Sequence, residues 1–285
     1  MTDPTASPPA HKPAAVWAPA GMSIPMWGPA DTPVSVLVGG VSELFQSDLD
    51  LGRLAVEQLL TEDFGPAVRF EEMHYGAVAV AQRLEDLKPR ALLLISAVKR
   101  NRPAGSVTRV RIDPPPLTPA DVQAAIGDAV TGYVHPDLII DIAHALGFLP
   151  ARTIAIEVEP EVIGSGDGLS AAATRGLHTA LDMIRTELRR APLLALADEL
   201  RPLVHDQQDR LEDSLPLDAL KDLLDELVLL DREGRWGHTF ALRDRFKLGI
   251  GHSNSSAGMD AQDWALWWML IEELDRLEAH EATQH

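Results

Sequence analysis

Residues 91–98 form a continuous run of apolar and small side chains, Ala-Leu-Leu-Leu-Ile-Ser-Ala-Val, and this run constrains the fold more than any other feature. Strands that are covered on both faces have such uninterrupted runs, because neither face alternates with a polar one. Buried strands of this kind occur in parallel sheets, where crossover helices cover both faces. The run therefore predicts an α/β fold.

Further strand and helix patterns alternate around this run. Strand patterns occupy residues 34–38, 67–71, 107–112 and 153–158, and helical patterns occupy residues 51–60, 78–87, 136–146 and 170–190. Residues 107–112 alternate apolar and polar side chains with period two, which favours an edge strand. We expect residues 34–190 to form one α/β domain with a mostly parallel sheet and helices on both faces.

Two segments lie outside this alternation. Residues 1–33 contain eight of the 21 prolines and predict a disordered or extended tail. Residues 191–285 hold 20 acidic and nine basic residues and predict an appended α-rich module, with a boundary near Ala191-Pro192. Its expected elements are an amphipathic helix over 217–230, a hairpin over 235–248, a glycine- and serine-rich loop over 249–258 and a helix over 260–278.

Composition excludes several classes of function. The chain has 285 residues and a net charge of −18, which argues against binding to nucleic acids or to anionic membranes. It has no cysteine, so disulfides, thiol nucleophiles and cysteine-ligated metals are excluded, and any metal would need His, Asp or Glu. No apolar run is long enough to span a membrane, and no signal peptide is apparent. We expect a cytoplasmic protein.

The loop after the first strand carries two glycines, Gly39 and Gly40, but no further glycine before Gly52. This spacing does not match a dinucleotide-binding loop, and the acidic residues that follow would repel a pyrophosphate. The loop instead reads Gly40-Val-Ser-Glu43, four residues, then Asp48-Leu-Asp-Leu-Gly52. Two later segments complete the pattern: Pro103-Ala-Gly-Ser-Val107, and Glu159-Pro-Glu161 followed by Gly166-Asp-Gly-Leu-Ser170.

These segments resemble those of the [NiFe]-hydrogenase maturation endopeptidases over residues 34–190. The resemblance implies an α/β fold and a nickel-dependent enzyme that removes a C-terminal peptide from the hydrogenase large-subunit precursor. It assigns the positions of the family's three nickel ligands to Leu49, Ser96 and Gly132, and none of these residues is a nickel ligand. Asp48, Asp50 and His135 lie next to these positions and are the candidate metal residues. The only cofactor implied is nickel.

Other interpretations of these residues stay open. Asp48 and Asp50 are also compatible with capping of the helix that follows, and His135-Pro136 is compatible with a helix start. Ser96 lacks the sequence context of a hydrolase nucleophile. The altered substrate loop, His74-Tyr75-Gly76, is either a plain turn or part of a partner-binding surface.

The tryptophans of the C-terminal module have two interpretations as well. They lie at helical spacing and suit either core packing or an interface: Trp264, Trp267 and Trp268.

Three functions follow from these observations. The first is a hydrogenase maturation endopeptidase with relocated ligands. The second is an assembly factor that binds the large-subunit precursor without cleaving it. The third is an unrelated interaction protein on the same fold. The resemblance favours hydrogenase maturation, and the altered ligand positions argue against the peptidase step.

Overall fold

The computed structural model describes residues 33–129, 134–206 and 215–233, together with Leu270. In chain order the elements are β1 (Val36–Val41), the 3-10 helix η1 (Asp48–Asp50), α1 (Leu51–Leu59), β2 (Val68–Met73), α2 (Ala77–Leu87), β3 (Ala91–Ala97), β4 (Val107–Ile112), α3 (Pro119–Ala129), α4 (Pro136–Ala145), β5 (Arg152–Val158), α5 (Ala171–Asp206) and α6 (Leu215–Glu233). The expected alternation of strands and helices is confirmed, and α3 is an addition to it.

The five strands form one sheet in the order β2-β1-β3-β5-β4. The neighbours β2, β1, β3 and β5 run parallel, and β4 pairs antiparallel with β5. The apolar run occupies the central strand, β3, in which every residue is buried. The predicted fold class is therefore confirmed, as is the edge position of residues 107–112.

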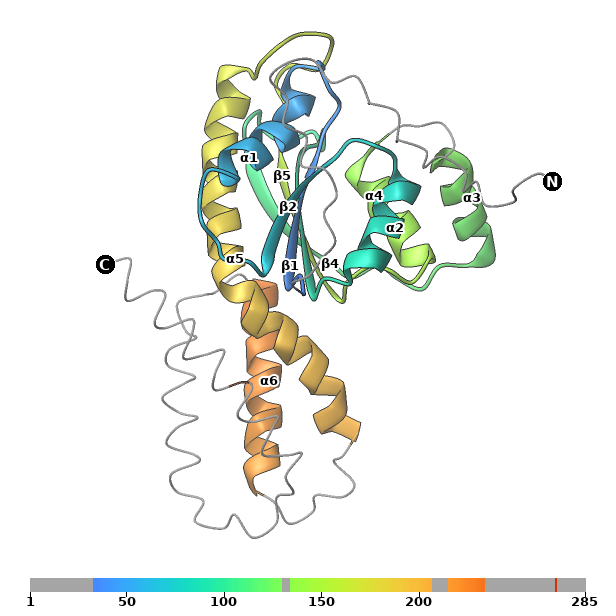
Figure 1. The fold of residues 1–285 in the computed structure, drawn as a ribbon, viewed down its shortest axis with the longest axis vertical. Coiled ribbons are helices and arrows are strands. Elements are labelled where there is room, and N and C mark those ends of the chain that lie inside the picture. The colour runs from blue at the N-terminus through green and yellow to red at the C-terminus, as the bar shows by residue number, and fades with distance from the viewer. Residues whose placement is uncertain (1–32, 130–133, 207–214, 234–269, 271–285) are drawn as a thin grey trace, which may run out of the picture. The chain divides into compact units, whose positions relative to one another are not determined.

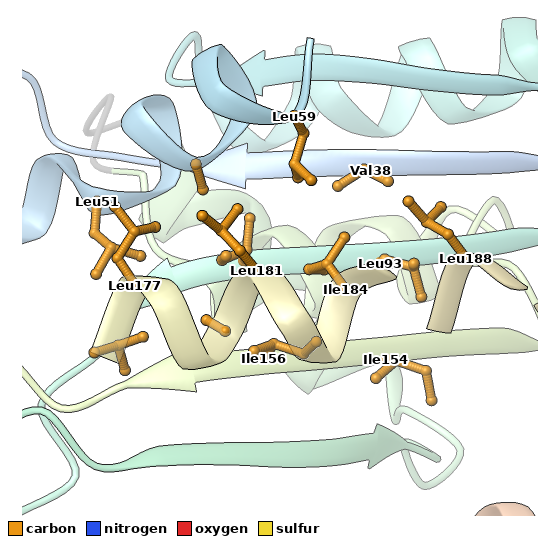
Figure 2. Packing of buried hydrophobic residues seen from close by; sticks show 14 of the residues in the cluster. Val38, Leu51, Leu59, Leu93, Ile154, Ile156, Leu177, Leu181, Ile184 and Leu188 are labelled. Carbon is orange, nitrogen blue, oxygen red and sulfur yellow. The ribbon is translucent and has the colours of Figure 1, made fainter. Parts of the chain in front are cut away.

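Helices cover both faces of the sheet (Figure 1). Alternate residues of β3 point to opposite faces: Leu93 and Ile95 pack with α1 and α5, whereas Leu92 and Leu94 pack with α2 and α4. Figure 2 shows how α5 presents a row of apolar side chains to the sheet at helical spacing. The labelled members of this row are Leu177, Leu181, Ile184 and Leu188. This continuous burial makes the sheet a rigid base for the loops at its ends.

A pair of glycines lets the first helix approach the first strand closely. The sequence pattern favours a strand that ends at Gly39-Gly40, but β1 continues to Val41. A side chain at Gly40 would place its Cβ 2.2 Å from the carbonyl oxygen of Gly52 in α1. Gly40 and Gly52 therefore both need to be glycine, because a larger residue at either position would push α1 away from the end of β1.

Helix α5 extends well beyond its predicted end at Arg190. It is continuous to Asp206, and the predicted boundary near Ala191-Pro192 lies inside it. A proline within a helix removes one backbone hydrogen bond and costs about 3 kcal/mol. Leucines beyond the proline are almost fully buried, and their burial offsets this cost: Leu193, Leu194, Leu196 and Leu200.

Four charged side chains join α6 to the sheet, and we call them the buried ion cluster; three are buried and Arg109 is partly buried. They are Arg109 of β4, Arg152 of β5, Glu187 of α5 and Asp231 of α6. Arg152 donates to both carboxylate oxygens of Asp231, at 2.7 and 2.8 Å. Arg109 donates to Asp231 at 2.6 Å and also to Glu187. Charge pairing thus fixes the end of α6 against β4 and β5.

The remaining predictions for the ends of the chain lie outside the described residues. These are the tail over 1–32 and the elements expected over 235–248, 249–258 and 260–278, except for the single residue Leu270. Among the helices that the structure describes, none combines the length and apolar character needed to cross a membrane.

Candidate functional site

A pocket of about 150 Å³ opens at the carboxyl ends of β1 and β3. The chain leaves β1 toward β2 on one side and returns to β3 on the other, so this is the point where the strand order reverses. Ligands of open α/β sheets bind at such points. The lining residues are Val41, Ser42, Glu43, Leu49, Ser96, Ala97, Val98, Lys99, Val134, His135, Pro136 and Ile163.

The positions that the sequence resemblance singled out meet in this pocket. Leu49 and Ser96, which are assigned to two of the family's ligands, both line it. The third position, Gly132, lies outside the described residues, but His135 lines the pocket three residues further along the chain. Residues from η1, β3 and the start of α4 therefore converge, although they are far apart in sequence.

Ser96 is the most buried polar residue of the pocket. It occupies the sixth position of β3 on the same face as Leu92 and Leu94, and its exposed fraction is 2%. Its Oγ makes no hydrogen bond within the described part of the chain. A buried hydroxyl without a partner costs about 1–3 kcal/mol, so this residue is expensive to keep for structure alone.

His135 is the N-cap residue of α4, as the His-Pro sequence predicted. Its backbone is extended (φ −134°, ψ 143°), and Pro136 occupies the first turn. Its Nδ1 accepts the backbone N–H of Asp137 at 3.3 Å. This assignment leaves the proton of the neutral ring on Nε2, and it fixes the ring at the pocket wall.

Asp48 is completely buried and binds the loop that follows β5. Its carboxylate accepts the backbone N–H groups of Glu161 and Val162, both at 2.8 Å, and that of Ser170 at 2.6 Å. The hydroxyl of Ser170 adds a fourth bond at 2.9 Å. The carboxylate therefore binds both ends of the loop over residues 161–170 and does not cap α1.

Asp50 is the N-cap residue of α1 but makes no capping hydrogen bond. Its two carboxylate oxygens instead accept Arg53 Nε at 2.9 and 3.0 Å, and Arg53 Nη2 adds a further contact. The three candidate metal residues, Asp48, Asp50 and His135, are thus not brought together. In the part of the chain that the structure describes, no cluster of three or more His, Asp or Glu side chains could hold a metal ion.

The motif segments hold one another at this end of the sheet. The backbone N–H of Gly105 donates to Glu159 at 2.8 Å, and that of Glu159 donates to Ser106 at 2.9 Å. The loop after β1 is joined to the loop after β5 in the same way, since Ser47 N–H donates to Gly166 and Gly166 N–H donates to Phe45, both at 3.0 Å. All three motifs therefore form a single scaffold around the pocket.

Glu159 fixes the loop that carries Lys99. Its carboxylate accepts the backbone N–H groups of Arg100 at 2.8 Å and Asn101 at 3.0 Å. Burial alone would raise the pKa of Glu159, but these hydrogen bonds and that of Arg102 outweigh it and hold the pKa below its ordinary value. The carboxylate therefore stays charged and keeps this loop in place.

Two charged residues of the pocket were not singled out as site residues by the sequence. Glu43 and Lys99 both line it, and neither forms an ion pair within the described part of the chain. Lys99 follows the end of the central strand, and this position is the signal that points to it, because such residues face the crevice of an α/β sheet. Among the described residues, the pocket thus holds one side chain of each charge, Lys99 and Glu43, without an ion pair.

Exposed apolar side chains stand beside the pocket on the two joined loops, and we call them the apolar rim: Leu44, Phe45, Val162 and Ile163. Phe45 is 65% exposed, and Ile163, which also lines the pocket, is 49% exposed. Large apolar side chains exposed in one place are typical of an interaction site. No pattern in the sequence predicts this rim, because its residues come from two loops.

The other predicted partner-binding residues lie elsewhere. His74, Tyr75 and Gly76 form the turn between β2 and α2, and none of them lines the pocket. Gly76 has a φ of +99°, which favours glycine. Burial raises the pKa of Tyr75 to about 12. Their partner-binding role stays a prediction, as does that of Trp264, Trp267 and Trp268, which lie outside the described residues.

Comparison with known proteins finds similar solved structures. No protein-family model and no curated protein matches the chain. The endopeptidase HybD from E. coli is 20% identical, covers 55% of this chain and 94% of its own length, and gives a TM-score of 0.41. The hydrogenase 2 maturation peptidase from Thaumarchaeota archaeon SCGC_AB-539-E09 is 20% identical over 54% of this chain and 97% of its own, with a TM-score of 0.39. The [NiFe] hydrogenase maturation protease HybD from Thermococcus kodakarensis is 14% identical, covers 54% of this chain and 98% of its own length, and gives a TM-score of 0.38.

Proposed function

We propose that this chain is a maturation factor for a [NiFe] hydrogenase and that it acts on the large-subunit precursor. One observation carries the proposal: Leu49, Ser96 and His135, at or beside the positions that the motif resemblance assigns to the metal ligands, line a single pocket. The three motif segments form the scaffold of that pocket by direct hydrogen bonds. Motifs and pocket therefore belong to one functional unit.

The side chains of the pocket do not fit a nickel ion. Leu49 offers no donor atom, and Ser96 offers a neutral hydroxyl in place of a carboxylate. The neighbouring carboxylates of Asp48 and Asp50 are held by other bonds. A divalent ion of this kind needs several fixed nitrogen or oxygen donors, and only Glu43 and His135 supply strong ones. We therefore favour an assembly factor that binds the precursor over an enzyme that cleaves it.

The partner is a protein, and the surface offered to it is the apolar rim. The net charge of −18 argues against nucleic acid. The rim also carries an exposed aromatic residue, Phe45, of the kind that anchors protein interfaces. The setting that follows from this function is the cytoplasm, where the precursor is made.

Co-purification with the large-subunit precursor from the same genome tests the proposal. The full chain should recover the precursor, and intact-mass analysis should show the precursor at its unprocessed mass. Phe45→Ser in the rim should reduce recovery by about tenfold, the scale of an interface anchor. Leu60→Ser, at an apolar position that is 50% exposed but lies outside the rim, should leave recovery unchanged.

Two outcomes would overturn the proposal. Failure of the folded full chain to recover the precursor would refute the partner. A precursor shortened at its C-terminus only when this chain is present would restore the peptidase function, and the loss of that cleavage in His135→Ala would place it at this pocket.

A further inference from the structure

The hydroxyl of Ser96 lies in the wall of the pocket. It is buried, lines the pocket and makes no hydrogen bond within the described residues. A hydroxyl can donate one hydrogen bond and accept others. A ligand with an oxygen acceptor would satisfy this group and recover the cost of burying it.

Positive charge also lines the pocket. Lys99 lines it three residues after Ser96 and has no ion pair within the described part of the chain. The N-terminus of α4, a helix of ten residues, also faces it through His135 and Pro136. The dipole of a helix favours an anion at its N-terminus.

The negative charges around α4 and Lys99 are mostly accounted for. Asp137 lies in the first turn of α4, but Arg100 donates to its two oxygens at 2.6 and 2.9 Å. Glu157 is held by Arg100 and Arg102. Glu43 is the one carboxylate among the lining residues, and it has no ion pair within the described part of the chain; it comes from the loop after β1, beside the apolar rim.

We propose that the pocket binds the free carboxylate at the C-terminus of a peptide whose last residue is small or aliphatic. The hydroxyl of Ser96 donates to one carboxylate oxygen, and Lys99 neutralises the charge. Glu43 accepts a hydrogen bond from a backbone N–H of the peptide. Leu49 and Ser96 stand where the motif resemblance assigns metal ligands, and an acidic ligand there would repel this carboxylate.

The surroundings favour a peptide over a small anion such as phosphate. The wall beside the polar groups is aliphatic, with Val41, Leu49, Val98 and Val134. The pocket volume of about 150 Å³ accommodates a terminal carboxylate together with a short side chain. Ile163 of the apolar rim lines the pocket, and the rim can cover the peptide residues that precede the C-terminus. This inference rests on the proposed function for the identity of the partner, whose exposed C-terminus would be the natural ligand.

Titration of the full chain with a short peptide tests the inference. The probe is N-acetyl-Ala-Ala-Val with a free carboxylate, compared with the same peptide as a C-terminal amide, and backbone amide signals are followed by NMR. The acid should shift the signals of Ser96 and Lys99 and should bind at least about tenfold more tightly than the amide, as expected for a hydrogen-bonded charge. Equal binding of the two, or no shift of these signals, would overturn the inference.

Variants then locate the carboxylate. Ser96→Ala and Lys99→Met should each weaken binding by about fivefold to tenfold, and Ser96→Asp should abolish it. Glu43→Gln should strengthen binding a few-fold, because it removes a like charge while the amide oxygen of Gln still accepts the peptide N–H. Ser106→Ala is the matched control: Ser106 Oγ is also buried without a hydrogen bond in the described chain but does not line the pocket. A loss in Ser106→Ala equal to that in Ser96→Ala would refute the assignment.

Two competing ligands separate the alternatives. Inorganic phosphate should compete only weakly, and competition as strong as that of the peptide would show a general anion site. Nickel chloride at one equivalent should not displace the peptide, and stoichiometric displacement would show a metal site. The titration uses no precursor, so peptide binding without precursor recovery would refute only the proposed partner. Precursor recovery without peptide binding would refute only this inference.

Discussion

The buried ion cluster and the pocket both contain buried polar side chains, but these side chains differ in whether they have partners. In the ion cluster every charged side chain faces at least one opposite charge, as Arg152 faces Asp231. In the pocket Ser96 has no hydrogen bond, and Lys99 and Glu43 have no ion pair, within the described residues. Paired groups fix elements to one another, whereas groups without a partner in a concave surface can form bonds to a ligand. The difference indicates that polar side chains without a hydrogen bond or ion pair point to the candidate binding surface better than charge itself does.

Breaking the ion cluster should have the largest effect on stability. Asp231→Asn leaves the buried Arg152 and the partly buried Arg109 without their shared carboxylate. We expect a loss of about 3–5 kcal/mol in the free energy of unfolding, measured with urea. Asp225→Asn on the same helix is the control, because its pair with Arg201 is exposed and should cost less than about 1 kcal/mol. Equal losses would contradict the comparison.

Removing the carboxylate that joins the motif loops should have the next largest effect. Asp48→Ala leaves three backbone N–H groups and one hydroxyl without their acceptor. We expect a loss of about 3 kcal/mol, since hydrogen bonds to a charged group are each worth about 1.5–3 kcal/mol and water replaces part of them. Asp50→Ala should cost about 1 kcal/mol, because Asp50 pairs only with the nearby, partly exposed Arg53. A greater loss of unfolding free energy in Asp50→Ala than in Asp48→Ala would contradict the roles assigned to these two carboxylates.

The pH dependence of stability sharpens the same comparison. Burial would raise the pKa of Asp231, but the hydrogen bonds and charge of Arg152 outweigh it and hold the pKa below its ordinary value. A carboxyl group of this kind stabilises the fold above its unfolded pKa of about 3.9, and the contribution is lost as the pH falls through the folded pKa. The difference in unfolding free energy between wild type and Asp231→Asn should therefore be largest above pH 5 and should shrink below about pH 4. A difference that stays constant down to pH 2.5 would argue against the pairing.

Local pattern was sufficient to predict the sheet but not α3. The run over residues 91–98 and the alternating strand and helix patterns predicted the four parallel strands, because burial on both faces leaves a strong signal in sequence. Helix α3 was missed, since many of its side chains are exposed and show no clear apolar face. Its start did carry a signal: Thr118 and Asp121 bond each other's backbone N–H groups at 3.3 and 2.9 Å, as in a capping box.

The site was predictable in position but not in its bonding. The motif resemblance placed Leu49, Ser96 and a nearby histidine together, and the structure brings Leu49, Ser96 and His135 to one pocket. The bonding of Asp48 to residues 161–170 could not be foreseen, because no local pattern encodes a contact across more than 100 residues. The apolar rim likewise arises only when two distant loops are joined.

The smallest expected effect separates two serines of the pocket that differ mainly in their partners. Ser42 and Ser96 are both buried and both line the pocket, but Ser42 Oγ accepts the backbone N–H of Arg53 at 2.6 Å, whereas Ser96 Oγ has no hydrogen bond in the described chain. Ser42→Ala should therefore cost about 1 kcal/mol of unfolding free energy. Ser96→Ala should be neutral or stabilising by up to about 1 kcal/mol, because it removes a buried hydroxyl that has no hydrogen bond within the described chain to offset its burial. Thermal and urea unfolding of both variants would measure this difference. If Ser96→Ala destabilises the chain as much as Ser42→Ala, the hydroxyl has a structural partner, and the pocket loses the feature that distinguishes it from the ion cluster.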